Sequence, residues 1–235
     1  MLSIATLLLP IAVAAGAPAA PQAPAPADAQ GWRSLFDGKT TTGWRGFKSD
    51  TFPLERWKVE DGALRQAGPH TESGTRDIVT TETFGDFDFR FEWKIAPGGN
   101  SGVKYLVTEE RRGPIAHEYQ VVDDEKHPDA LIGPHRQTAA FYDVLPPAAD
   151  KPVRAAGEWN QSRVLVKGNH VEHWLNGRKV LAYELGSPEL KAAIAKSKFK
   201  DVPGFDAKLE GRLLLQDHGD EVWYRNLRIQ APPRP

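Results

Sequence analysis

Three short segments of the chain place polar side chains at alternate positions between apolar ones. In residues 87–93 every second side chain is aromatic and the side chains between them are charged. A period of two indicates a β-strand with one buried and one solvent-facing side. Residues 102–107 and 117–122 show a similar alternation. If these strands are neighbours, one sheet face gathers carboxylate, amide and cationic side chains, namely Arg90, Glu92, Lys104, Glu118 and Gln120.

Such a face suits acid–base chemistry on a sugar, because paired carboxylates can act as acid and base and polar groups match its hydroxyls. Glu118 is the candidate acid–base residue, since a mid-strand position holds its side chain rigidly. Lys104 has the same parity on the preceding strand and is the candidate stabiliser of an anionic oxygen. Asn100 shares this parity. The alternative is that these charges form ordinary pairs on a solvent-facing sheet, worth under about 1 kcal/mol each.

Histidine and tryptophan side chains add candidates at the ends of strands. His135 lies in a Gly-Pro-His-Arg-Gln loop, and His218 follows an expected strand. His218 is the alternative base, because unperturbed histidine titrates near neutral pH. His173 has the parity of core residues and is expected to be buried, which leaves Trp174 on the opposite side to stack on a sugar ring.

The seven histidines show no paired metal-ligand spacing. The sequence therefore predicts no metal and no cofactor. The alternative is a zinc site of two or three histidines that only the folded chain brings together. Nucleotide-binding glycine loops and the H-E-x-x-H motif are absent from the sequence.

The remaining pattern is also one of short strands. Asn176-Gly177 separates two of them and is a strong hairpin signal. One helix is expected near residues 187–198, where Ser187 is a suitable N-cap and Pro188 suits the first helical position. The predicted fold is an all-β, antiparallel, two-sheet jelly-roll sandwich with one short helix. The further expected strands cover residues 163–167, 170–175, 178–183, 212–216 and 222–229.

Composition restricts the possible partners. The 235 residues include 30 basic and 31 acidic side chains, for a formal net charge of −1. A balanced charge gives no reason to expect nucleic acid as a partner. The chain has no cysteine, which excludes disulfides, thiolate metal sites and a cysteine nucleophile.

The first thirty residues are expected to be export and linker sequence. Residues 1–17 form an apolar run that ends in an Ala-Gly-Ala cleavage pattern, which predicts a signal peptide. No basic residue precedes the run, so the signal is atypical or begins upstream, and an Ala-rich tail is the alternative. Residues 18–30 are an Ala/Pro-rich linker, and residues 31–230 form one domain. No membrane span is expected after cleavage.

An ordered set of motifs covers nearly all of this domain. It begins with Trp-Arg-Ser-Leu-Phe-Asp-Gly at residues 32–38, followed by Gly43 and Trp44. Together these motifs resemble the 3-keto-disaccharide hydrolase domain family, a concanavalin A-like jelly roll of exported bacterial proteins. The other matching segments are residues 57–62, 80–94, 96–105, 117–124, 157–160, 173–178, 215–220 and 223–229.

The resemblance implies cleavage of glycosides whose sugar carries a ketone at carbon 3. A base removes the C2 proton, the enolate expels the C1 substituent, and addition of water makes the sum a hydrolysis. A lyase or a hydratase carries out only part of this sequence. Catalytic candidates are then Glu118, Lys104 and His218. The alternatives are a non-catalytic carbohydrate-binding module or an envelope interaction domain. The substrate-binding candidates are Arg90, Glu92, Asn100, Gln120, Asp123, His135, Trp174 and Gln216.

We expect the mature protein to begin near Ala17 or Pro18 and to lie in the periplasm or outside the cell, because the apolar run precedes a cleavage pattern. Mass spectrometry of the N-terminus of protein recovered from cell fractions checks this. Intact Met1 on protein from the cytoplasm would contradict it.

Overall fold

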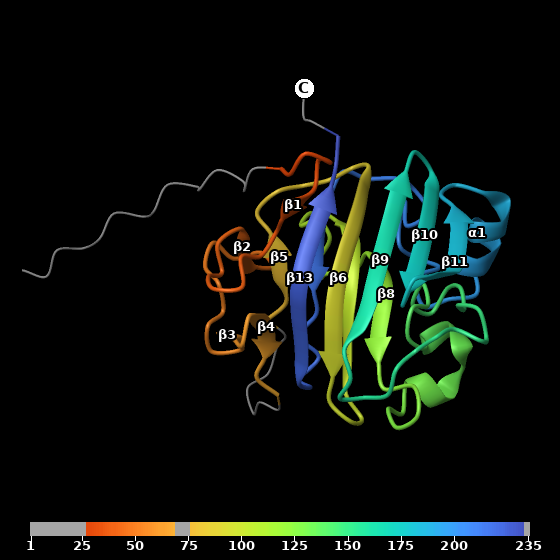
Figure 1. The fold of residues 1–235 in the computed structure, drawn as a ribbon. Coiled ribbons are helices and arrows are strands. Elements are labelled where there is room, and N and C mark those ends of the chain that lie inside the picture. Colours follow the sequence, from red (N-terminus) through yellow and green to blue (C-terminus); the bar gives the residue numbers. More distant parts are fainter. Residues whose placement is uncertain (1–26, 69–75, 233–235) are drawn as a thin grey trace, which may run out of the picture.

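Two antiparallel sheets stack face to face in the computed structural model, which describes residues 27–68 and 76–232. Figure 1 shows the large sheet in front, with β8 of the small sheet behind it. The expected signal peptide over residues 1–17 and the linker up to residue 26 lie outside the described residues. The predicted all-β sandwich is confirmed.

The large sheet holds eight strands and the small sheet five. In spatial order the large sheet consists of β11 (Arg178–Glu184), β10 (His170–Leu175), β9 (Asn160–Lys167), β6 (Phe87–Ile95), β13 (Val222–Gln230), β4 (Ala63–Gln66) and β3 (Trp57–Glu60), with β1 (Arg33–Ser34) paired to β13. The small sheet consists of β2 (Trp44–Gly46), β5 (Ile78–Thr80), β12 (Arg212–Leu215), β7 (Asn100–Val107) and β8 (His117–Val122).

The core lies between the sheets and is rich in aromatic rings. Phe87, Phe91 and the other aromatic residues of β6 are buried, as their alternation predicted. Their rings meet those of the small sheet edge to face, with centroids 6.4 Å apart for Phe87 and Tyr105 and 5.5 Å apart for Phe91 and Tyr119. Edge-to-face contacts of this kind stabilise a core beyond the area that they bury.

His173 is a core residue, as its parity predicted. Its Nε2 lies 2.7 Å from the hydroxyl of Tyr105, and its Nδ1 lies 2.9 Å from the carbonyl oxygen of Ala139. Burial lowers the pKa of His173 to about 4, so the ring is neutral at pH 7 and both of its nitrogens have partners.

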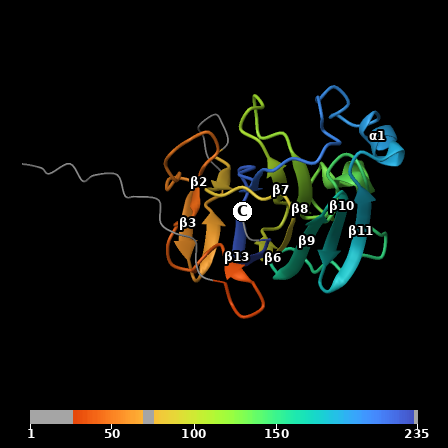
Figure 2. The same cartoon turned by 90° about the horizontal axis from the view of Figure 1, so that it is seen from above.

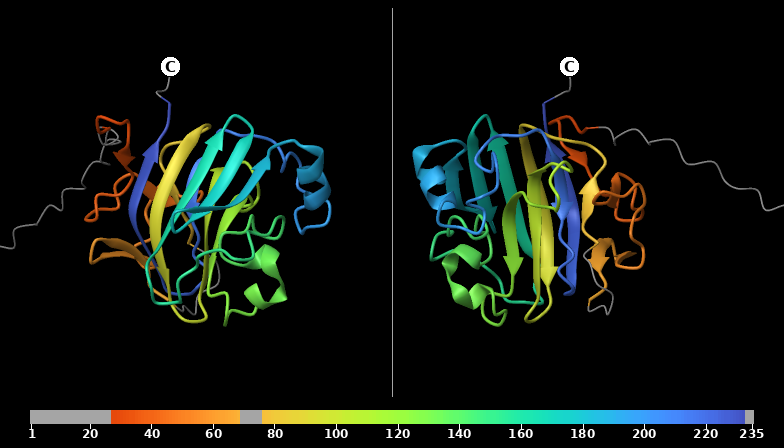
Figure 3. Two further views of the ribbon diagram at one scale, coloured as in Figure 1. Left: turned by 45° about the vertical axis from the view of Figure 1, so that its right-hand side comes forward. Right: turned by 180° about the vertical axis from the view of Figure 1, so that it is seen from behind.

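The expected helix is present but shorter. It is α1 (Pro188–Ile194), and the hydroxyl of Ser187 accepts the Leu190 N–H at 3.1 Å, which confirms the predicted N-cap. The chain then leaves the helix in turns that bond Lys196 to Ala193 and Ser197 to Ile194. Figures 2 and 3 show α1 beyond the β10–β11 edge of the large sheet. In the described residues no helix is both long and apolar enough to cross a bilayer.

The expectation that residues 87–93 and 102–107 form neighbouring strands is wrong. β6 lies in the large sheet and β7 in the small one, because the Pro-Gly-Gly turn at residues 97–99 carries the chain from one layer to the other. Side chains that point away from the core on these two strands therefore face opposite sides of the sandwich. β7 and β8 are neighbours, as expected.

Candidate active site

A carboxylate and an ammonium group lie side by side on the outer face of the small sheet. The register of β7 and β8 sets Lys104 directly opposite Glu118. The Nζ atom of Lys104 lies 3.5 Å from Oε2 of Glu118 and donates to the carbonyl oxygen of Pro114 at 3.1 Å. The side chains are only 10% and 6% exposed, so this is a largely desolvated ion pair and not the surface pair of the alternative interpretation.

The space for the Glu118 side chain comes from a residue without a side chain. Gly102 precedes Lys104 by two residues, on the same face of β7, and pairs with Gln120 of β8. A Cβ atom at residue 102 would collide with Oε1 of Glu118 and lie 2.9 Å from its Cδ. With its nitrogen turned toward the acceptors, the amide of Gln120 donates to Oε1 of Glu118 at 3.3 Å and to the carbonyl oxygen of Ser101 at 3.0 Å. Glu118 is thus fixed from several sides.

This pair forms the floor of a pocket of about 330 Å³, called here the Glu118 pocket. Its volume lies within the range of ligand pockets, roughly 300 to 1,000 Å³. Strands β7, β8 and the segment after β12 form its base, and loops on either side form its walls. The lining residues are Asn100, Lys104, Pro114, Ile115, Ala116, Glu118, Gln120, Tyr142, Lys198, Phe199, Val202, Gln216 and His218.

Two polar lining residues, Tyr142 and Lys198, were not among the sequence candidates. The Nζ atom of Lys198 lies 4.0 Å from the centre of the Tyr142 ring. Burial lowers the pKa of Lys198, although the negative charge of Glu118 opposes this shift. Burial and a hydrogen bond to Asp129 raise the pKa of Tyr142. Both residues come from irregular segments, so no periodicity marks them as neighbours of Glu118.

One buried oxygen in the pocket has no hydrogen-bond partner. The Oε1 atom of Gln216 is shielded from water and accepts no bond from any residue that the structure describes. A buried acceptor without a donor is costly, so the Gln216 side chain must turn before its oxygen can meet a ligand.

The segment that carries Gln216 and His218 is anchored by two buried carboxylates. Oδ1 of Asp77 accepts the backbone N–H of Asp217 at 2.8 Å. Asp217 in turn accepts the Gln66 amide at 2.7 Å and the backbone N–H of Gly219 at 3.0 Å. Burial raises the pKa of Asp77 to about 6, although Lys104 and the bond from Asp217 oppose this shift.

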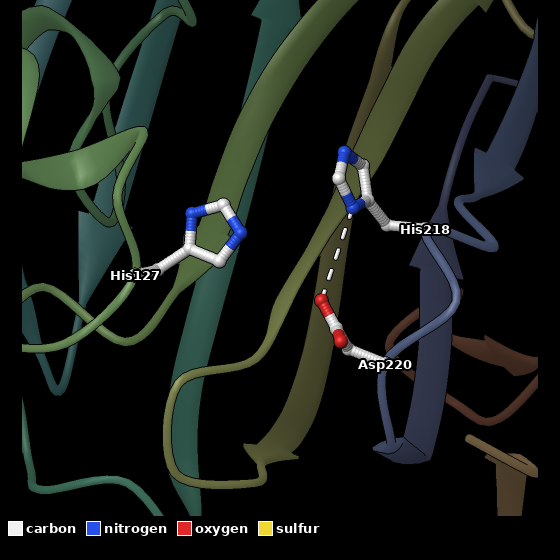
Figure 4. Close-up of side chains that lie close together, drawn as sticks. All are labelled: His127, His218 and Asp220. Carbon is white, nitrogen blue, oxygen red and sulfur yellow. Dashed lines mark ion pairs between the residues drawn. The ribbon is translucent and has the colours of Figure 1, made fainter. Parts of the chain in front are cut away.

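Beside His218 the fold gathers two more side chains that can ligate a metal. His127, His218 and Asp220 each offer an atom, and these atoms lie within 4.8 Å of one another. Figure 4 shows the three side chains turned toward one another, with an ion pair between His218 and Asp220. Burial, and to a lesser degree His218, lowers the pKa of His127. His127 was not among the sequence candidates.

The other sequence candidates lie away from the pocket. Arg90 and Glu92 are on the outer face of the large sheet, so the expectation that they share one surface with Glu118 is wrong. Trp174 lines the same outer face, where its indole N–H donates to Glu172 at 2.7 Å.

Two loop candidates also have local partners of their own. The carboxylate of Asp123 accepts the backbone N–H of Gly98 at 2.7 Å and that of Glu125 at 3.0 Å, so it shapes two turns. His135 lies 3.7 Å from the Asp143 carboxylate and is not among the residues that line the Glu118 pocket.

Comparison with known proteins identifies the family of the chain. A family model described as a 3-keto-alpha-glucoside-1,2-lyase-like domain matches residues 31–230. A 3-keto-disaccharide hydrolase of Bacteroides thetaiotaomicron is 36% identical over 234 residues, covering 88% of this chain and 80% of the relative. A crystal structure of a candidate glycosyl hydrolase from Parabacteroides distasonis has a TM-score of 0.78 and 34% identity, covering 87% of this chain and 95% of that one. The β-glucanase of Bacillus licheniformis, at 10% identity and a TM-score of 0.50 over 86% of this chain and 97% of its own, shares the fold alone.

We expect Asp77→Asn to make the protein increasingly more stable than the wild type as pH rises from about 4 to 6. The folded state binds the Asp77 proton more tightly than the unfolded state does, since the pKa rises from 3.8 to about 6 on folding. Deprotonation therefore lowers wild-type stability across this window, by up to about 3 kcal/mol. Urea unfolding of both proteins at several pH values measures the difference, and a difference that is independent of pH would refute the assignment.

Proposed function

The chain belongs to the 3-keto-alpha-glucoside-1,2-lyase-like domain family, and we propose that it cleaves glycosides whose sugar carries a ketone at carbon 3. The observation that carries this proposal is the buried pair of Glu118 and Lys104 at the floor of a pocket. A reaction that creates an enolate needs a base and a cation close together, and these two groups supply both.

In the proposed mechanism Glu118 handles the proton. The C3 ketone acidifies the hydrogen on C2, and the carboxylate removes that hydrogen as a proton. The electron pair of the C2–H bond forms the enolate, which then expels the C1 substituent. Among the described residues Glu118 is the carboxylate that lines the pocket, so we assign to it the return of the proton to the departing oxygen as well.

Lys104 stabilises the charge that develops on the C3 oxygen. Its ammonium group lies 3.5 Å from Glu118 and is shielded from water, where a positive charge interacts more strongly with an oxyanion than it does in bulk solvent. The ammonium group also bonds to the Pro114 carbonyl oxygen, which helps to fix its position. Electrostatic stabilisation by a group that is already in place needs little reorganisation during the reaction.

Amide groups around the pair suit the hydroxyls of a sugar. Asn100, Gln120 and Gln216 each bring an amide group to the lining. Tyr142 and Phe199 contribute ring surfaces, which can pack on the apolar face of a sugar ring. This combination supports a carbohydrate ligand in the Glu118 pocket.

The names of the family and of the relative differ in one chemical step. A lyase stops after elimination, whereas a hydrolase also adds water to the unsaturated product. The described pocket has the groups that both routes share, namely a base and an oxyanion stabiliser. We propose the hydrolytic outcome, because the 36% identical relative is a hydrolase.

We expect Glu118→Gln to lower the rate of cleavage of a 3-keto-disaccharide by roughly a hundredfold or more. The amide keeps the shape of the side chain but cannot accept the C2 proton. Release of free sugars from the 3-keto-disaccharide and from its unoxidised parent measures the activity and the requirement for the ketone.

Glu92→Gln is the matched control for this experiment. Glu92 is also a strand carboxylate, but it lies on the outer face of the large sheet and accepts Arg225 Nε at 2.8 Å. We expect this variant to keep the wild-type rate. If Glu118→Gln keeps nearly full activity while His218→Ala loses it, the base is not Glu118 and the roles must be reassigned. A wild-type protein that binds the sugar without cleaving it is a carbohydrate-binding module.

We expect Gly102→Ala to lower the rate by about a hundredfold, because the new methyl group displaces the Glu118 carboxylate. The displaced atoms are the end of a flexible side chain, which can move without moving the strands. Gly85→Ala is the control, since a Cβ atom there meets no neighbouring atom. Circular dichroism verifies the fold of both variants, and equal activity in the two would show that the position of Glu118 is unimportant.

A further inference from the structure

Three side chains from two separate loops converge at one end of the Glu118 pocket. His127 lies in the loop that follows β8, and His218 and Asp220 lie in the segment between β12 and β13. The Nδ1 atom of His218 is 3.8 Å from Oδ2 of Asp220. The Nδ1 atom of His127 accepts the backbone N–H of Asp129 at 3.2 Å, which leaves Nε2 as the nitrogen facing the other two side chains (Figure 4).

We propose that His127, His218 and Asp220 bind one divalent transition metal ion of the Zn²⁺ type. Two imidazole nitrogens and one carboxylate oxygen form a donor set that favours such ions over Mg²⁺ and Ca²⁺, which prefer oxygen ligands. Zinc bonds to these atoms are about 2.0 to 2.2 Å long, so tetrahedral ligand atoms are roughly 3.4 Å apart. The three atoms here lie within 4.8 Å of one another and need to close by little more than 1 Å.

Asn100 contacts two of the three side chains. Its backbone N–H donates to Oδ2 of Asp220 at 3.0 Å, and its side-chain amide lies 3.5 Å from Nε2 of His218. Groups that bond to the far side of metal ligands orient them for the ion. Metal binding through Nε2 of His127 places the ring proton on Nδ1, so the bond from the Asp129 amide is given up.

The metal would adjoin the bound sugar, a consequence that rests on the proposed function. Three protein ligands leave a fourth position open, which is the pattern of catalytic and not of structural zinc sites. His218 and Asn100 both line the Glu118 pocket, so an ion beside them is placed to bind an oxygen atom of the ligand. The metal site itself requires no carbohydrate, and its test uses none.

Isothermal titration of ZnCl₂ into the full chain, freed of metal by a chelator, tests the site. We expect one tight equivalent per chain, with the affinity lowered roughly a hundredfold or more in His127→Ala. Asp220→Asn should weaken binding as well, and it retains an oxygen for the Asn100 N–H if the alanine variant folds poorly. Circular dichroism reports the fold of each variant.

His135→Ala is the control, because His135 is a half-buried histidine outside this cluster. It should bind zinc within about threefold of the wild type. The proposal is overturned if the wild type takes up no stoichiometric zinc, or if His127→Ala and Asp220→Asn bind it as tightly as His135→Ala does. Because no sugar is present, failure of the Glu118 mechanism leaves this result unaffected.

Discussion

The buried pair of Lys104 and Glu118 is the constraint on which the rest of the site depends. Two desolvated charges are tolerated only when they face each other closely and their remaining polar atoms have partners. The register of β7 and β8 provides the first condition, and Gln120 and the Pro114 carbonyl oxygen provide the second. Gly102 must lack a side chain for the carboxylate to fit. Removing one partner alone would leave an uncompensated buried charge. A substitution at Lys104, Glu118 or Gly102 therefore disturbs the other two residues as well.

Local sequence patterns correctly predicted which side chains face the core and where the helix begins. The aromatic residues of β6, the core position of His173 and the N-cap of α1 all follow from patterns within a few residues. Periodicity does not say which sheet a strand joins. The turn after β6 transfers the chain to the other layer, and Arg90 and Glu92 were therefore predicted on the wrong surface while Lys104, Glu118 and Gln120 were correctly grouped.

The walls of the Glu118 pocket could not be predicted in the same way. Tyr142 and Lys198 come from segments without a repeating pattern, and they meet only because separate loops pack over the small sheet. His127 and His218 are likewise brought together by two loops, one of which is held by the buried carboxylates of Asp77 and Asp217. Such contacts depend on the tertiary fold, and the spacing of residues along the chain carries no trace of them.

The pairing of β1 with β13 joins the first and the last strand of the fold at the large sheet. The Glu118 pocket opens on the outer face of the small sheet, on the opposite side of the sandwich. A solid support or a second enzyme attached beside β1 or β13 would therefore lie behind the pocket and leave its mouth clear.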